Sequence, residues 1–373
     1  MKRFRAPGEA EAAERAWPVV RAAFEQRERV NWPRRHARSL MAAALVAAAV
    51  AALLSPPGRS VINSLRKAVG IEHAKRELFS LPARGRLLVQ ARSGVWVVHA
   101  DGSKRKLAGY REASWSPHGL YLVATRRNEL ATLEDNGNVH WTLARPGVRF
   151  PRWGGTRTDT RIAYADRERI SAIRVVGGDG RGDHWLAKDF VPIAPAWRPG
   201  KEHVLAVAHT DGRIRLWEAD TRALIATSPK LPRPIELAWS ADGSRLFALA
   251  SRRLSILDRR GRLLSVRRLP AGTVATAIAT SPHGARVAVL VRRDGRSEVG
   301  VLSQAYRRVF SGAGHFTGLA WSPDRGWLLV AWKEADQWVF MRSARVKTIR
   351  AVSGISSQFG GGGFPALAGW CCP

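Results

Sequence analysis

A short corner motif recurs along the chain and constrains its fold more than any other feature. The segment S-W-S-P-H-G at residues 114–119 returns as W-S-A-D-G at 239–243, T-S-P-H-G at 280–284 and W-S-P-D-R-G at 321–326. Aligning the corners gives one anchor residue per repeat, with successive spacings of 38, 44, 42, 41 and 41 residues: Trp115, Trp153, Trp197, Trp239, Thr280 and Trp321. So regular a spacing indicates a repeat protein.

The corner predicts a tight turn between two antiparallel strands. Proline suits the second position of a type I turn because its φ is already fixed, and glycine suits the fourth position. A short apolar run follows each corner and is typical of a strand: 121–125, 161–165, 204–208, 245–250, 286–291 and 327–332.

Further alternating segments, such as 213–218 and 255–257, bring each period to about four strands with almost no helical periodicity. Four-stranded units of about 40–45 residues are typical of a β-propeller, whose blades pack their apolar faces against their neighbours. We therefore expect the anchor residues to pack between blades. The alternative is that the tryptophans form stacking platforms for a ligand.

The two ends of the repeat region complement each other. Three predicted strands at the start of the repeat region lack an inner partner: 86–90, 94–99 and 103–107. At the other end, the segment 364–371 carries Trp370 in the anchor position, 49 residues after Trp321. We predict that 364–371 becomes the innermost strand of the blade that begins at residue 86. The domain at 84–373 would then be an all-β, seven-bladed propeller without an open sheet edge. Six blades with a free tail are the alternative.

These corners resemble the repeats of the WD40-like, TolB-type β-propeller family of bacteria, whose units carry W-S-P-D-G before a short apolar strand. Residues 321–324 match best, whereas Ala241 replaces the proline and Thr280 replaces the tryptophan. The resemblance covers residues 86–370. It implies a propeller used for protein binding, envelope scaffolding or sensing, without one shared active site.

A different composition precedes the repeats. Residues 40–54 are an unbroken apolar run, with Arg34, Arg35 and Arg38 before it and Pro56 after it. The positive-inside rule places the arginines in the cytoplasm. We predict a transmembrane signal anchor at 39–55 and a single-pass protein of the cell membrane, with the propeller extracytoplasmic. A cleaved signal peptide and a buried soluble helix are the alternatives.

Two further segments flank the predicted span. The basic cytoplasmic segment 1–38 contains an amphipathic pattern at 8–29, which predicts a short helix. Residues 56–83 form a juxtamembrane linker in which Val61, Leu65 and Val69 recur every fourth residue. An alternative function is an anti-sigma-like transmembrane regulator that uses the cytoplasmic helix to hold a partner.

The charge of the chain favours anionic partners. Lysine and arginine total 61 against 30 acidic residues, a net charge of +31. Outside the membrane such a field favours an acidic protein or another anionic ligand of the envelope, and nucleic acid is an unfavoured partner because the tryptophans already serve as anchors. Three arginine pairs fall between the second and third strands of a repeat, on the face opposite the corners, and form a candidate binding face: Arg126, Arg127, Arg252, Arg253, Arg292 and Arg293. Ordinary solvated turns in an arginine-rich chain are the alternative.

The sequence offers no catalytic residue, metal ligand or cofactor motif. His118 and His283 occupy the third position of the corner, where Asp324 stands in a later repeat, so a turn role is favoured. The adjacent Cys371 and Cys372 allow three arrangements: a vicinal disulfide, a link between chains, or two thiols. We therefore predict a non-enzymatic, membrane-anchored scaffold or sensor that binds a protein or envelope ligand. A propeller enzyme with an unrecognised site in the channel is the alternative.

Overall fold

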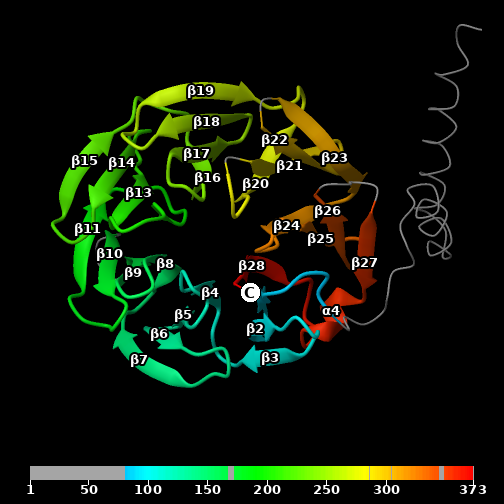
Figure 1. Ribbon diagram of the computed structural model, residues 1–373, viewed down its shortest axis with the longest axis horizontal. Helices are drawn as coiled ribbons and strands as arrows, with labels where there is room; N and C mark the ends of the chain where they lie inside the picture. Colours follow the sequence, from blue (N-terminus) through cyan, green and yellow to red (C-terminus); the bar gives the residue numbers. More distant parts are fainter. Residues whose placement is uncertain (1–79, 167–171, 285, 304, 344–347, 373) are drawn as a thin grey trace, which may run out of the picture. The chain divides into compact units, whose positions relative to one another are not determined.

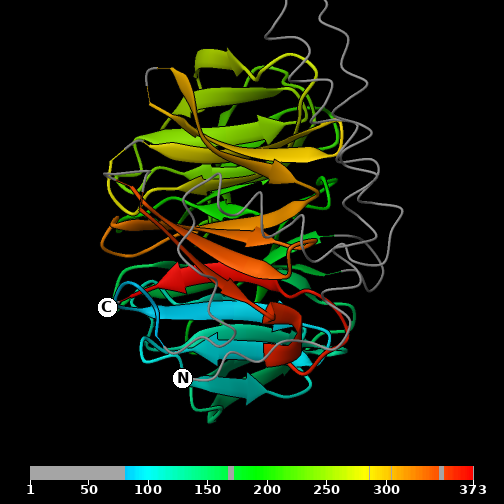
Figure 2. The same ribbon diagram turned by 90° about the vertical axis from the view of Figure 1, so that its right-hand side faces the viewer.

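The computed structural model describes residues 80–166, 172–284, 286–303, 305–343 and 348–372. Their strands form seven antiparallel four-stranded sheets, arranged as blades around a common axis (Figure 1). The side view shows the strands running across the thickness of the ring (Figure 2). The prediction of an all-β propeller with seven blades, rather than six, is confirmed.

Each blade is given from its innermost strand outward. Blade I contains β28 (Ala366–Cys371), β1 (Arg86–Ala91), β2 (Gly94–Val98) and β3 (Lys104–Leu107). Blade II contains β4 (Glu112–Trp115), β5 (Leu122–Arg126), β6 (Glu129–Leu133) and β7 (Val139–Ala144). Blade III contains β8 (Arg149–Gly155), β9 (Thr160–Asp166), β10 (Ala172–Gly177) and β11 (His184–Lys188).

Blade IV contains β12 (Ala196–Trp197), β13 (Val204–Ala208), β14 (Ile214–Glu218) and β15 (Ala223–Thr227). Blade V contains β16 (Pro234–Trp239), β17 (Arg245–Ala250), β18 (Arg253–Asp258) and β19 (Leu263–Arg268). Blade VI contains β20 (Val274–Thr280), β21 (Val287–Arg293), β22 (Arg296–Leu302) and β23 (Tyr306–Ala313). Blade VII contains β24 (Phe316–Trp321), β25 (Trp327–Trp332), β26 (Gln337–Arg342) and β27 (Ile349–Ser353).

The C-terminal strand closes the ring. Strand β28 pairs antiparallel with β1, so that Trp370 lies opposite Leu87 and Ala366 lies opposite Gln90. The last strand of the chain is therefore the innermost strand of the first blade, as the sequence predicted. This pairing removes the open inner edge that blade I would otherwise have.

The hydrophobic core lies between the blades. Each pair of neighbouring blades shares one cluster of buried side chains, including the pair formed by the last and first blades. At that seam Leu87 and Trp370 of blade I pack with Trp338 and Phe340 of blade VII. Because every blade buries both faces in this way, the fold is stabilised around the whole ring.

The anchor residues stand at or near the carboxyl ends of the inner strands, and several of the tryptophans donate a hydrogen bond to the preceding blade. The indole Nε1 of Trp197 donates to the Arg152 carbonyl at 2.9 Å, and that of Trp239 donates to the Ala196 carbonyl at 3.1 Å. In both cases the acceptor is the residue just before the anchor of the preceding blade. The structure therefore places these tryptophans between blades, where they act in packing.

The serine of the corner explains why the motif is W-S rather than W alone. Ser116 is buried, its carbonyl accepts the Gly119 N–H at 2.9 Å, and its Oγ accepts the Tyr121 N–H at 3.1 Å. Ser240 and Ser322 accept the N–H of the fifth residue after them in the same way, at 3.0 and 2.8 Å. The hydroxyl thus fixes the start of the second strand in three blades.

The predicted N-terminal segments lie almost entirely outside the described residues. These are the cytoplasmic segment 1–38, the span 39–55, and the linker 56–83 except its last four residues. Among the residues that the structure describes, no helix is long and apolar enough to cross a membrane. A short helix that was not predicted, α4 (Ile355–Gln358), follows blade VII. Its Ile355 and the adjacent Phe359 are fully buried in the cluster between blades VII and I.

Candidate binding sites

The ring has two faces that carry different loops. We call the face with the W-S-P-x-G turns the corner face, and the face with the turns between second and third strands the hairpin face. The predicted arginine pairs lie on the hairpin face, at the β5–β6, β17–β18 and β21–β22 turns. Blades V and VI are neighbours, but blade II is separated from both by two blades. The structure therefore brings together four of the six arginines, and Arg126 and Arg127 lie apart.

The separate pair differs also in its contacts. Arg126 stacks on the Tyr110 ring at 4.3 Å, donates to its hydroxyl at 2.8 Å and lies 3.8 Å from the Glu129 carboxylate. These contacts give Arg126 a role within blade II.

On blades V and VI the arginines are exposed and poorly compensated. Arg293 pairs with Asp294 at 3.2 Å, whereas Arg252, Arg253 and Arg292 have no ion pair within the described part of the chain. Two further exposed arginines adjoin them, because Arg253 lies opposite Arg268 across the β18–β19 ladder and Arg293 lies opposite Arg296 across the β21–β22 ladder. We call this group the basic hairpin surface: Arg252, Arg253, Arg268, Arg292, Arg293 and Arg296.

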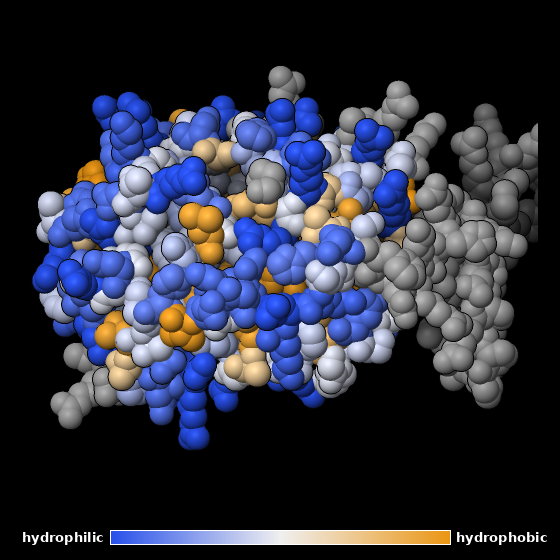
Figure 3. All heavy atoms as spheres, turned by 60° about the horizontal axis from the view of Figure 1, so that its bottom comes forward, coloured by the Kyte–Doolittle hydropathy of each residue, from blue (hydrophilic) through white to orange (hydrophobic). Residues whose placement is uncertain are grey.

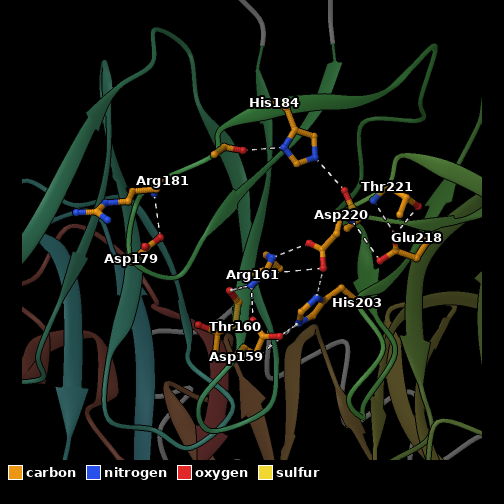
Figure 4. A network of polar contacts seen from close by, with 12 residues as sticks. Asp159, Thr160, Arg161, Asp179, Arg181, His184, His203, Glu218, Asp220 and Thr221 are labelled. Atoms are coloured by element: carbon orange, nitrogen blue, oxygen red, sulfur yellow. Dashed lines mark hydrogen bonds and ion pairs between the residues drawn. The ribbon is translucent and has the colours of Figure 1, made fainter.

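On the corner face, a cleft of about 640 Å³ opens between blades III and IV. It is lined by the β8–β9 turn, the β10–β11 turn and Asp220 of the β14–β15 turn, and its polar side chains converge in Figure 4. Arg161 is the centre of this network. Its Nε donates to Asp220 at 2.7 Å and its Nη1 donates to Asp159 at 2.5 Å.

Beneath Arg161 lies a buried histidine. His203 Nδ1 is 2.7 Å from Asp220 Oδ2, and its Nε2 is 3.6 Å from Asp159 Oδ2. Burial raises the pKa of Asp220, but the hydrogen bonds from Arg161 and His203 outweigh burial and lower it. The network therefore holds Asp220 as an anion that ties blade III to blade IV.

Three residues of this cluster carry side chains that can ligate a metal ion. Ligand atoms of His203, Glu218 and Asp220 lie within 4.8 Å of one another. However, Glu218 already accepts the Thr221 N–H at 2.7 Å, and the Arg161 guanidinium is bonded to Asp220. A cation would have to displace a guanidinium from its carboxylate, so this donor set fits a structural hydrogen-bond network and we assign no metal to it.

Carboxylates also occur on the inner strands that surround the axis. Glu236 accepts the Ile278 N–H at 2.9 Å and Glu112 accepts the Phe150 N–H at 2.6 Å, so each joins its blade to the next. Burial raises the pKa of Glu236 to about 7, although the Ile278 hydrogen bond and the charge of Arg152 lower it. Both glutamates therefore connect neighbouring inner strands through these hydrogen bonds.

The remaining predicted residues lie on the corner face. His118 and His283 are exposed in their turns, which agrees with a turn role. Cys371 and Cys372 form a disulfide with each other, the vicinal arrangement among the three alternatives. The disulfide packs closely against the corner of blade II, since a Cβ placed on Gly119 would lie 2.7 Å from Cys372 Sγ.

Comparison with known proteins identifies the fold and nothing narrower. No family model matches the sequence, and no curated protein matches it. Among solved structures, the chain is similar to a functionally unknown protein from Desulfotomaculum acetoxidans, with a TM-score of 0.58, 13% identity, and coverage of 78% of this chain and 100% of that one.

Two other solved structures are also similar to the chain. The β-propeller domain of Myceliophteria thermophila Cps50 (Swd1) aligns with a TM-score of 0.53 and 12% identity over 66% of this chain and 87% of that one. Kuenenia stuttgartiensis hydrazine synthase aligns with a TM-score of 0.51 and 15% identity over 65% and 79%. Identities this low show a shared architecture alone, so the comparisons and the structure agree that the chain is a β-propeller.

Proposed function

We propose that this chain is a membrane-anchored, extracytoplasmic β-propeller of the bacterial TolB-like kind, which binds an acidic protein or polymer of the cell envelope. The basic hairpin surface would make the contact, and the segment 39–55 would hold the ring at the membrane. In this proposal the ring is a rigid scaffold that presents loops, and binding involves no chemical step.

The observation that carries the proposal is the pairing of like charges within the basic hairpin surface. Arg253 faces Arg268 and Arg293 faces Arg296 across neighbouring strands. Like charges directly opposite each other destabilise a sheet. Two such pairs on adjacent blades therefore cost stability, and an anionic partner that neutralises them would recover it.

The wider charge distribution supports the same reading. The surface seen in Figure 3 is mainly hydrophilic, with hydrophobic residues in small separate groups. A net charge of +31 attracts acidic partners over roughly one Debye length, about 8 Å at physiological salt. The binding should accordingly weaken as salt is raised.

Charge reversal on blades V and VI tests the proposal. The full chain with Arg252, Arg253, Arg292 and Arg293 changed to glutamate is compared with the unchanged chain in binding to poly-L-glutamate. Each arginine near an anionic surface contributes about 1 kcal/mol, so four reversals weaken binding by well over tenfold.

The control reverses four exposed arginines of the corner face: Arg84, Arg157, Arg181 and Arg286. It removes the same net charge, and we expect it to weaken binding by only a fewfold. Equal losses in the two variants would show that only the total charge matters, which would refute a hairpin binding surface.

A further inference from the structure

A second concentration of positive charge lies on the corner face, between blades IV and V. A pocket of about 550 Å³ is lined there by four cationic side chains, which we call the arginine pocket: Arg198, Lys201, Arg259 and Arg260. Two carboxylates, Glu202 and Asp242, also line it. The positive charges therefore outnumber the negative ones.

The positive charge is poorly compensated where it is most buried. The side chain of Arg198 is 14% exposed, and its only ion pair among the described residues is with Glu202, which is 72% exposed. Burial and the charge of Arg259 both lower the pKa of Arg198. Arg198 Nη1 also donates to the Arg259 carbonyl at 3.4 Å, so the two arginines meet at the pocket that both line, and an anion there would relieve the repulsion between their charges.

The second carboxylate is already engaged. Asp242 Oδ1 accepts hydrogen bonds from the Ser240 hydroxyl at 2.5 Å and from the Ser244 N–H at 3.0 Å. These bonds lower its pKa and fix it within the corner turn. Asp242 therefore stays charged, but within the described residues it makes no ion pair with the cationic side chains of the pocket.

An apolar surface adjoins this pocket. We call it the apolar rim, and it comprises the exposed large side chains of the outermost strands β15 and β19: Leu224, Ile225, Leu263, Leu264 and Val266, which are 48%, 50%, 39%, 54% and 42% exposed. Ile225 belongs to the lining of the pocket as well. The β18–β19 turn packs on β15, because a Cβ on Gly261 would lie 3.7 Å from Ala226 Cβ.

We infer that the arginine pocket and the apolar rim together bind an anionic phospholipid at a bilayer surface. The phosphate of the headgroup would enter the pocket, where arginine and lysine can donate several charge-assisted hydrogen bonds. The apolar rim would lie in the interfacial layer of the membrane, as apolar side chains flanked by basic ones do in interfacial proteins. A free phosphate would use the pocket and leave the rim exposed, so the combination favours a lipid.

This site is separate from the basic hairpin surface, which lies on the opposite face. It also holds whether or not residues 39–55 span the membrane, because a soluble ring with this surface would still contact an anionic bilayer. Failure of the proposed function would therefore leave this inference standing, and the reverse is also true.

Contact with the bilayer can be measured on the full chain. A cysteine introduced at Leu264 carries a bimane fluorophore, since Cys371 and Cys372 are joined to each other. Vesicles of acyl-brominated phosphatidylcholine quench the fluorophore only when the rim reaches the acyl region. We expect quenching to rise as phosphatidylglycerol is added. At a fixed phosphatidylglycerol fraction, R198Q/R259Q should raise the lipid concentration for half-maximal quenching by about tenfold or more.

The matched control is R92Q/R111Q, which removes two exposed arginines from the hairpin face of blades I and II, outside both proposed surfaces, and should shift the midpoint less than about twofold. R198K/R259K retains both charges and should shift it only slightly, which guards against a fold defect in the glutamine variant. Quenching that is independent of phosphatidylglycerol, or shifted equally by both glutamine variants, would overturn the inference.

Competition by inorganic phosphate provides a second test, which distinguishes a soluble anion from a lipid. If phosphate competes for the pocket as tightly as phosphatidylglycerol vesicles while the fluorophore remains unquenched, the pocket is a site for a soluble anion and the lipid assignment is wrong. If phosphate competes only weakly and quenching requires phosphatidylglycerol, the bilayer is the ligand.

Discussion

The indole Nε1 of Trp239 donates a hydrogen bond to the carbonyl oxygen of Ala196 at 3.1 Å, which joins the inner strand of blade V to that of blade IV. Trp321 makes the same contact with Ala279, again at 3.1 Å. Trp370, at the closing seam, is similarly buried, but its Nε1 has no hydrogen-bond partner in the part of the chain that the structure describes. The anchors thus share a position but not all of their interactions.

This difference predicts that the same substitution lowers the free energy of unfolding by unequal amounts at the two positions. Trp239→Phe removes packing and leaves the Ala196 carbonyl without its donor, whereas Trp370→Phe removes packing alone. We expect Trp239→Phe to lower the free energy of unfolding by about 1 kcal/mol more than Trp370→Phe. Urea unfolding of the two variants measures this difference. Equal losses of unfolding free energy would show that the hydrogen bond adds nothing to stability.

A glycine beside another anchor gives a steric prediction. A Cβ on Gly154 would lie 2.2 Å from Cγ of Trp197, so Gly154→Ala forces the indole out of its place between blades III and IV. We expect a loss of about 1–3 kcal/mol in unfolding free energy. The nearby exposed Arg157→Ala should change it by less than about 0.5 kcal/mol, and a similar small effect for Gly154→Ala would contradict the observed packing.

Much of the architecture followed from local patterns in the sequence. The corner specifies its own turn, because proline fixes φ and the serine hydroxyl holds the next strand. Strands at 204–208, 245–250 and 327–332 therefore agree with β13, β17 and β25 residue for residue. The closing strand was predictable because Trp370 repeats the anchor position.

The clustered charges were less predictable, because they depend on distant parts of the chain. Arg161 and Asp220 are 59 residues apart and meet only because blades III and IV pack side by side. The separation of Arg126 from Arg252 and Arg292 arises from the order of the blades around the ring. The pairing of Arg253 with Arg268 depends on the register of β18 and β19, which includes an irregularity that the sequence does not reveal.

Closure of the ring by β28 predicts a strong effect of truncation. Deleting residues 364–373 exposes the inner edge of β1 and removes Trp370 from the seam cluster. We expect the melting temperature to fall by about 10 °C or more, since several kcal/mol of packing are lost. Adding the synthetic peptide 364–373 should restore part of the loss in a concentration-dependent way, and an unchanged melt on deletion would contradict closure.

Two groups with shifted pKa values, His209 and Glu236, make opposite contributions to the pH dependence of stability. Burial and the charge of Arg215 lower the pKa of His209 from 6.5 to about 4. As the pH falls from 6.5 to 4, the unfolded chain gains a proton at this position that the folded chain does not, so stability falls by about 2–3 kcal/mol. His209→Asn removes this loss, and urea unfolding across that range should show a more stable protein at acid pH relative to the unchanged chain.

The contribution of Glu236 to the pH dependence of stability has the opposite sign. Its pKa is raised from 4.5 to about 7 in the folded chain, so the folded form retains a proton that the unfolded chain has lost, and stability falls as the pH rises from 4.5 to 7. Glu236→Gln retains an acceptor for the Ile278 N–H and should abolish this fall. If both variants follow the pH profile of the unchanged chain, these shifts in pKa do not contribute to stability.

The functional proposal depends above all on the ring lying outside the cytoplasm. Single cysteines introduced at the exposed Asn138 of the propeller and at Ala10 of the basic segment can be labelled in spheroplasts with a membrane-impermeant maleimide. We predict that the cysteine at 138 reacts in intact spheroplasts, while the one at 10 reacts only after lysis. Protection of position 138 before lysis, or reaction of position 10 in intact spheroplasts, would contradict the account.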